Sequence, residues 1–163
     1  MSFFENIDIG FWDIFLTIIL LYLIYIMFIR KEPEIPMPKV IPPLKKQDLT
    51  LEELKKYNGK DDEHICFAIL GKILDVSKSP NFYGPGGPYG NLCGHDATRA
   101  LATMDTKNVK DEYDDISDLT DGEKEIAKDW LDKLSMKYPT VGRLLADGEE
   151  PNDYGDEVSK VEF

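Results

Sequence analysis

One apolar stretch near the start of the chain is too long and too uniform for an ordinary helix of a small globular domain. Residues 14–29 read IFLTIILLYLIYIMFI, sixteen residues with a single Thr and no charge. Including the flank from Ile9 extends the stretch to twenty-one residues, interrupted by Asp13. A membrane-spanning helix needs about 20 apolar residues, whereas the core of a signal peptide has about 7–15. We therefore expect an uncleaved transmembrane anchor over about residues 11–29, within an N-terminal segment of residues 1–30.

The charges on either side of this stretch predict its orientation. Glu5, Asp8 and Asp13 precede its centre, whereas Arg30 and Lys31 follow it directly. Positive charge favours the cytosolic side of a membrane, so the C-terminal part of the chain is expected in the cytosol. The two cysteines of the chain agree with that reducing compartment. A short span favours the thin membrane of the endoplasmic reticulum.

Composition divides the rest of the chain into a linker, one domain and a tail. Five of the ten prolines lie in residues 31–43, which predicts a stiff, extended linker. The chain carries 31 acidic and 19 basic residues, a formal net charge of −12, which argues against binding to nucleic acid. Acidic residues dominate residues 148–163, which are expected to form a disordered tail. Residues 44–147 remain for one compact domain.

Local patterns within residues 44–147 predict several short helices. Capping boxes at Thr50–Glu53 and Thr120–Glu123 each predict the start of a helix. Residues 96–104 favour another short helix, and the apolar spacing within residues 141–145 favours a last one before Gly-containing sequence.

The remaining apolar runs predict a small sheet, which makes the domain α+β. Residues 65–70 and 73–76 are apolar and are separated by Gly71 and Lys72. Glycine at the first central position of a two-residue loop suits a type II′ hairpin turn. Trp130, on the apolar face of the later helix, is expected to be an ordinary core residue.

The segment between these elements is a loop rich in glycine and proline. Residues 81–91 read NFYGPGGPYGN, in which Tyr83 and Tyr89 bracket five consecutive Gly and Pro residues. Proline stiffens such a loop, and glycine lets the backbone turn tightly or approach a flat ligand closely. A rigid loop with two phenols could ligate or hydrogen-bond a planar group, although turns of this composition are common.

Three other motifs follow this loop in a fixed order. They are GHDATRALA in residues 94–102, DEYDDISDLT in residues 111–120 and MKYPTVGRLL in residues 136–145. Together with the loop they closely resemble the membrane-associated progesterone receptor component family, a branch of the cytochrome b5-like haem/steroid-binding fold. The resemblance covers about residues 44–154 and implies a cytochrome b5-like domain.

The resemblance also implies a cofactor and the residues that hold it. It implies ferric, five-coordinate haem with Tyr89 as the axial ligand of the iron. The position of Tyr83 is implied to hydrogen-bond near the haem, and those of Lys137 and Tyr138 to contact its propionate side or the loop. Phenolate is a hard anionic ligand that stabilises ferric iron, and a nearby lysine favours the phenolate form.

The same resemblance implies a regulatory function. The implied function is a haem-dependent adaptor or regulator of microsomal haem-thiolate monooxygenases or their reductase in sterol metabolism, with haem-mediated homodimers. A steroid- or lipid-binding membrane receptor and a haem-independent trafficking scaffold are the alternatives. The sequence contains no Ser-His-Asp set, phosphate loop or HExxH motif, so an enzyme is not expected. Gly86, His95 and Cys93 depart from the usual family residues and are expected to alter surface contacts rather than ligation.

The chain also contains other residues that could ligate haem iron. Cytochrome b5 itself holds haem between two histidines, and this chain contains His64 and His95. The first lies in an acidic turn and is expected at the surface, and the second is expected to cap a helix or face solvent. Cys93 has no neighbour in the sequence that would activate a thiolate. The acidic residues of 111–121 do not have the spacing of a calcium loop and predict a solvated face.

Overall fold

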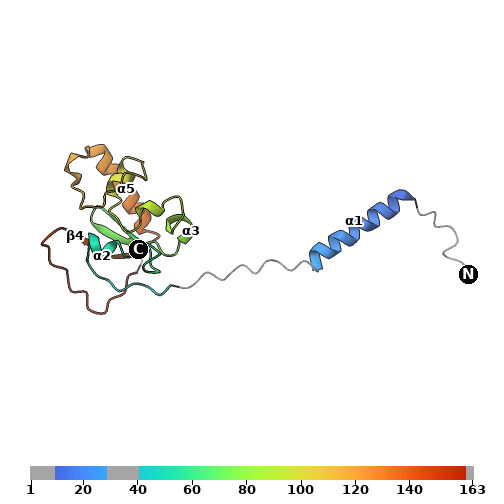
Figure 1. Cartoon of the computed structure of the whole chain (residues 1–163), viewed down its shortest axis with the longest axis horizontal. Helices are drawn as coiled ribbons and strands as arrows, with labels where there is room; N and C mark the ends of the chain where they lie inside the picture. Colours follow the sequence, from blue (N-terminus) through green and yellow to red (C-terminus); the bar gives the residue numbers. More distant parts are fainter. Residues whose placement is uncertain (1–9, 29–40, 161–163) are drawn as a thin grey trace, which may run out of the picture. The chain divides into compact units, whose positions relative to one another are not determined.

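The computed structural model describes residues 10–28 and 41–160, which belong to two separate compact units (Figure 1). The first unit comprises residues 1–39 and the second begins at Val40. Residues 31–40 of the expected proline-rich linker (residues 31–43) lie outside the described residues. The basic residues Arg30 and Lys31 lie outside them as well.

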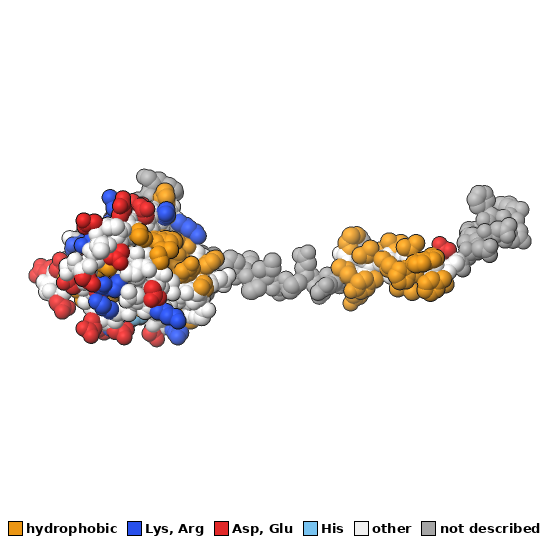
Figure 2. All heavy atoms as spheres, turned by 90° about the horizontal axis from the view of Figure 1, so that it is seen from above, with side chains coloured by type: hydrophobic (Ala, Val, Ile, Leu, Met, Phe, Trp, Pro, Cys, Tyr) orange, Lys and Arg blue, Asp and Glu red, His pale blue; other side chains and the backbone are white. Residues whose placement is uncertain are grey.

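The first unit contains one helix, α1 (Phe11–Phe28). The carboxylate of Asp13 accepts a hydrogen bond of 2.9 Å from the backbone nitrogen of Gly10, and hydrophobic side chains cover most of the face of the helix that Figure 2 shows. At about 1.5 Å per residue, α1 is about 27 Å long, against ~30 Å for a bilayer core. Within the described ranges, no helix combines the length and the hydropathy needed to cross a membrane. The span expected over residues 11–29 is therefore unsupported.

The second unit is built on a four-stranded sheet in the order β1-β4-β3-β2. The β2–β3 and β3–β4 pairs are antiparallel, whereas the edge strand β1 runs parallel to β4. The strands are β1 (Leu49–Thr50), β2 (Cys66–Ile69), β3 (Lys72–Asp75) and β4 (Thr140–Leu145).

Short helices surround this sheet, and both predicted capping boxes are confirmed. Thr50 and Glu53 cap each other's backbone nitrogens at the start of one helix, and Thr120 and Glu123 do the same at another. The helices are α2 (Leu51–Leu54), α3 (Pro80–Tyr83), η1 (Gly90–Leu92), α4 (Thr98–Ala102), η2 (Ile116–Asp118) and α5 (Asp121–Ser135).

The sheet is buried on both faces, which is why its strands read as continuous apolar runs. Phe67 and Leu74 belong to the core cluster that also contains side chains from α4 and α5. Their neighbours Cys66 and Ile73 point to the other face, where they pack in a second cluster with Val141. Alternation along each strand therefore divides the apolar side chains between two cores.

The hairpin between β2 and β3 is confirmed, but its turn differs from the expected one. Ile69 pairs with Lys72, so the two central residues are Leu70 and Gly71 rather than Gly71 and Lys72. Their φ angles are 46° and 75°, and positive φ at both positions is the signature of a type I′ turn. The expected type II′ turn is therefore wrong: the turn is of type I′ and its central residues lie one position earlier in the chain.

The last short helix expected within residues 141–145 is a strand instead. β4 lies between β1 and β3, and hydrogen bonds to both neighbours replace those of a helix. A Cβ atom on Gly142 would lie 2.0 Å from the carbonyl oxygen of Gln47, so the two backbones meet where only glycine fits. The apolar spacing of this segment suits a helix locally, but pairing with distant strands decides the outcome.

Residues 148–160, expected to be disordered, return to the start of the second unit. Lys45 forms an antiparallel bridge with Val158. The buried carboxylate of Asp48 accepts a hydrogen bond of 2.7 Å from the hydroxyl of Tyr154. The acidic composition predicts a solvated tail, but these specific partners hold the segment against the domain.

Candidate functional site

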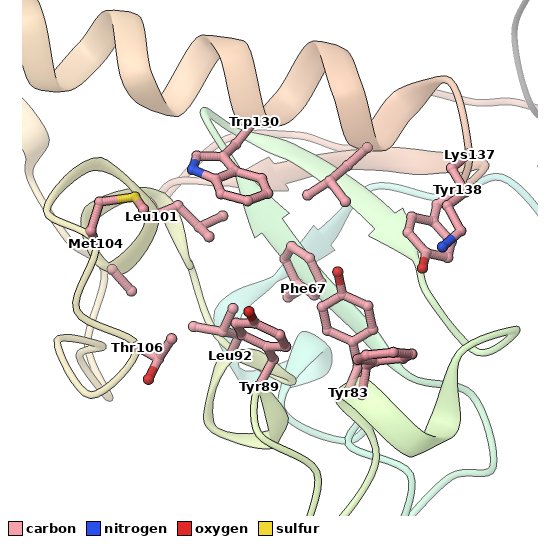
Figure 3. A pocket seen from close by; sticks show the side chains of 13 residues that line it. Phe67, Tyr83, Tyr89, Leu92, Leu101, Met104, Thr106, Trp130, Lys137 and Tyr138 are labelled. Atoms are coloured by element: carbon pink, nitrogen blue, oxygen red, sulfur yellow. The ribbon is translucent and has the colours of Figure 1, made fainter.

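A cavity of about 380 Å³ opens between the glycine- and proline-rich loop, the segment after α4, and α5 (Figure 3). This volume lies within the range of small-molecule sites, about 300–1,000 Å³. The lining is mostly apolar and aromatic. Its side chains are Phe67, Phe82, Tyr83, Tyr89, Leu92, Ala100, Leu101, Met104, Thr106, Trp130, Leu134, Lys137 and Tyr138.

All four residues singled out in the sequence line this cavity. Tyr83 and Tyr89 come from the loop, whereas Lys137 and Tyr138 follow α5. The ring centroid of Tyr83 lies 5.8 Å from that of Tyr89 and 5.9 Å from that of Tyr138. Tyr89 is 38% exposed, so its phenol stands at the mouth of the cavity.

Backbone contacts within the loop fix the position of Tyr89. Its backbone nitrogen donates a hydrogen bond of 2.9 Å to the carbonyl oxygen of Phe82 in α3, and Gly84 closes α3 by donating to Pro80. A Cβ atom on Gly87 would lie 2.5 Å from the same carbonyl oxygen of Phe82. The loop therefore folds back tightly on α3, and this packing presents the second tyrosine to the cavity.

Tyr83 is held beneath the mouth as a neutral phenol. Its ring lies 5.4 Å from that of Phe67, and its carbonyl oxygen accepts a bond of 2.9 Å from the thiol of Cys93. Burial, and then the neighbouring phenol of Tyr138, raises the pKa of Tyr83 to about 12. Burial likewise raises the pKa of the Cys93 thiol to about 12. Both groups therefore stay protonated at neutral pH.

Tyr138 and Lys137 close one end of the cavity. Tyr138 is only 2% exposed, and its hydroxyl is 2.8 Å from that of Ser79, at the start of the loop segment. The ammonium of Lys137 lies 5.1 Å from the centroid of the Tyr138 ring. Lys137 is the one cationic side chain in the cavity lining, so this end favours an anionic group.

The opposite wall contains residues that sequence reasoning missed. Trp130, expected to be ordinary core, is half-buried and lines the cavity, as do Leu101 and Met104. Trp130, Leu134 and Lys137 are spaced by four and three residues, which places them along one side of α5 and the turn after it. This spacing relative to Lys137 is the sequence signal that could have identified Trp130 as a cavity residue.

The two histidines do not line the cavity. The ring of His64 is half-buried and binds the carboxylate of Asp62 at 2.7 Å and the carbonyl oxygen of Pro42 at 3.0 Å. Burial lowers the pKa of His64, but these two hydrogen bonds outweigh it and raise the pKa above its usual value. His95 is 3.2 Å from a carboxylate oxygen of Asp111. Both rings thus have partners outside the cavity.

The acidic run of residues 111–121 is not wholly a solvated face. Asp114 is buried and receives two hydrogen bonds from the guanidinium of Arg99, at 2.6 and 2.9 Å. Asp118 receives two more, at 2.7 and 2.8 Å, and Lys110 also pairs with Asp114. These bonds tie α4, which contributes Ala100 and Leu101 to the cavity lining, to the segment of residues 110–118. Within the described ranges, no group of three or more His, Cys, Asp or Glu side chains could hold a metal ion.

This lining fits a flat, largely apolar ligand with an anionic edge. Aromatic and aliphatic side chains supply the walls, and Lys137 supplies a positive charge at one end. Tyr89 supplies a phenol oxygen that a metal centre of such a ligand could take as an anionic donor. The donor set is therefore compatible with haem, and the apolar walls are compatible with a steroid.

Comparison with known proteins defines the class of this domain. Residues 50–145 match the family described as Cytochrome b5-like Heme/Steroid binding domain, and the chain belongs to that family. An Arabidopsis thaliana protein of cytochrome b5 like fold superposes with a TM-score of 0.54 at 35% sequence identity. The match covers 66% of this chain and 97% of that protein. The expected cytochrome b5-like fold is confirmed.

Within this class, the chain is similar to the membrane-associated progesterone receptor components and to proteins related to them. It is 44% identical to protein vem-1 of Caenorhabditis elegans, over 91% of this chain and 81% of that protein. It is 47% identical to membrane-associated progesterone receptor component 2 of Homo sapiens, over 72% of this chain and 53% of the relative's length. It is 36% identical to the cytochrome P450 regulator dap1 of Schizosaccharomyces pombe, over 83% of this chain and 86% of that protein.

Proposed function

We propose that the cavity binds ferric haem and that the phenolate oxygen of Tyr89 is its axial ligand. The observation that carries this proposal is the exposure of Tyr89, 38%, on a loop held rigidly against α3. The other two cavity phenols are less suitable. Tyr83 has a pKa of about 12, and the hydroxyl of Tyr138 is engaged with Ser79. Haem held by one phenolate supplies a five-coordinate ferric centre of low reduction potential.

Other residues of the cavity have separate parts in this proposal. Lys137 pairs with a carboxylate of the ligand. Tyr83 donates a hydrogen bond as a neutral phenol. Phe67 and Trp130 supply apolar contact and exclude water. With a single protein ligand, this arrangement also favours a homodimer through the exposed face of the cofactor.

The wider function we propose is that of an adaptor or regulator of membrane-bound haem-thiolate monooxygenases or their reductase in sterol metabolism, rather than an enzyme. The names of the human and Schizosaccharomyces pombe relatives support a membrane location and a regulatory role. The net charge of −12 suits encounter with a basic partner. We propose attachment through α1 to the cytosolic side of the endoplasmic reticulum, because the sequence of that helix is almost entirely apolar.

Steroid binding without iron is the second candidate function. The lining of the cavity is largely apolar, and the family description includes steroids as well as haem. Such a ligand needs no phenolate, so its affinity would be insensitive to the Tyr89 hydroxyl. A haem-independent scaffold would bind neither ligand.

The test is titration of the full chain in detergent with ferric haem, followed by visible absorption. We expect a five-coordinate ferric spectrum that is lost in Tyr89→Phe. The matched control Tyr83→Phe keeps the iron ligand and loses one hydrogen bond, so it should retain the spectrum and only weaken binding. Binding that survives Tyr89→Phe but fails in His95→Ala would overturn the proposed ligand. If haem is not taken up, a rise in the melting temperature with progesterone would favour the steroid reading, and no rise would favour the scaffold.

A further inference from the structure

Two residues other than glycine have a positive φ within residues 10–28 and 41–160: Leu70 at 46° and Met104 at 57°. A side chain in this left-handed region is strained, because its Cβ atom crowds the following carbonyl oxygen. Leu70 offsets the strain by packing against two core clusters. Met104 has no such packing in the described core clusters and is 69% exposed.

The strain at Met104 arises because it occupies the position after a helix end that glycine normally fills. Helix α4 is capped by Thr103, and Met104 follows it. The backbone nitrogen of Met104 donates to the carbonyl oxygen of Leu101 at 3.4 Å, and that of Asp105 donates to Ala100 at 3.0 Å. This pair of bonds is the Schellman motif, whose left-handed residue is usually glycine. Local stability alone therefore favours glycine here.

The side chain of Met104 is nevertheless placed at the cavity. It lines the wall next to Leu101, at the end of the cavity away from Lys137 and Tyr138 (Figure 3). A thioether on three rotatable bonds adapts to irregular shapes and packs well against aromatic rings. A strained, exposed methionine with no packing in the core is explained if it packs against something bound in the cavity.

We infer that Met104 is a specificity-determining residue whose thioether packs against the apolar end of the bound ligand, opposite the anionic end at Lys137. This inference rests on the proposed function of the cavity. On this inference, the side chain of Met104 lowers the stability of the domain and strengthens the binding of the ligand. Glycine at this position would relieve the strain at the end of α4 and would remove an apolar contact with the ligand.

The experiment compares the melting temperature without ligand and the Kd for ferric haem in the full chain. Met104→Gly is expected to melt about 3 °C higher than the parent and to bind haem about ten-fold more weakly. Met104→Leu keeps the strain and the apolar bulk, so its melting temperature and Kd should stay near those of the parent. Leu70→Gly, which loses core packing, should melt lower without a specific loss of affinity.

Either of two results would overturn the inference: a Met104→Gly variant that melts no higher than the parent, or one that binds haem as tightly. Failure of the parent to take up haem would instead count against the proposed cofactor. In that case the same variants are titrated with progesterone, and equal affinity of the parent and Met104→Gly would again overturn the inference. A parent that binds neither probe overturns both proposals.

Discussion

At the scale of single residues, Gly142 is the position where β4 and the segment before β1 leave no room for a side chain. A Cβ atom there would lie 2.0 Å from the carbonyl oxygen of Gln47 and 2.9 Å from a carboxylate oxygen of Asp48. Gly142→Ala must therefore push β4 away from the segment before β1. We expect a loss of about 3 kcal/mol in the free energy of unfolding, measured by urea denaturation.

Gly122 provides the matched control for this substitution. An added Cβ atom there meets nothing within 4 Å, and the residue lies in the first turn of α5. Gly122→Ala should raise the free energy of unfolding by about 0.5 kcal/mol, because alanine loses less backbone entropy in a helix. Equal effects of the two substitutions would contradict the close approach at β4.

The residues of the candidate site were predictable where a chemically distinctive side chain lies in a distinctive sequence motif. Tyr83 and Tyr89 stand out because they flank a loop of unusual composition, and Lys137 because it lies in a recognisable motif. Trp130 and Met104 were missed because an apolar residue on a helix, or directly after one, has the same sequence pattern whether it faces a core or a cavity. Only the packing of α4 against α5 distinguishes the two environments.

At the scale of elements, hydrogen bonds from Arg99 tie α4, which contributes side chains to the cavity lining, to Asp114 and to Asp118 in η2. Hydrogen bonds from Arg99 lower the pKa of Asp114, outweighing burial, which raises it. Removing one partner of a buried ion pair leaves the other uncompensated and costs about 3 kcal/mol. Asp114→Ala should reduce the free energy of unfolding by that amount at pH 7, measured by urea denaturation.

The same pair predicts a dependence of stability on pH. Because the folded-state pKa of Asp114 is depressed, its contribution is present above the unfolded-state pKa of about 3.9 and is lost as pH falls below it. The parent should lose more stability than Asp114→Ala between pH 5 and pH 2. Asp111→Ala, which removes an exposed carboxylate from the same run, should change the stability at pH 7 by less than about 0.5 kcal/mol. A similar loss in both variants would contradict the buried pair.

Elements were predictable where the signal is local. The capping boxes mark α2 and α5, because each box satisfies backbone donors within four residues of its own position. β4 was not predictable from its own residues, because its partners β3 and β1 lie about 70 and about 95 residues earlier in the chain. The position of the hairpin turn depends likewise on which residues of β2 and β3 pair, here Ile69 with Lys72.

At the scale of the whole second unit, Asp48 joins its beginning to its end. Its buried carboxylate accepts hydrogen bonds from the backbone of Arg143 and Asn152, at 2.7 and 3.0 Å, and from the hydroxyl of Tyr154 at 2.7 Å. Burial raises the pKa of Asp48, but these bonds outweigh it and lower the pKa below its usual value. The carboxylate is therefore charged and well satisfied at neutral pH.

Asp48→Ala should release residues 148–160 and destabilise the unit. Loss of hydrogen bonds to a charged acceptor is expected to cost about 3 kcal/mol, and limited proteolysis should cut the released segment faster. Lys45→Ala is the control, because its pair with Asp156 joins two exposed side chains and should contribute less than about 0.5 kcal/mol. Unchanged proteolysis in Asp48→Ala would show that other contacts hold the segment.

The antiparallel bridge between Lys45 and Val158 has a topological consequence. The two ends of residues 41–160 run side by side, so a few added residues could join them into a closed ring. The ring could then be reopened between the exposed residues 60 and 61 without breaking a contact of the cavity. The order of the elements along the chain is thus separable from their arrangement in space, and the domain should tolerate circular permutation or insertion into a host protein.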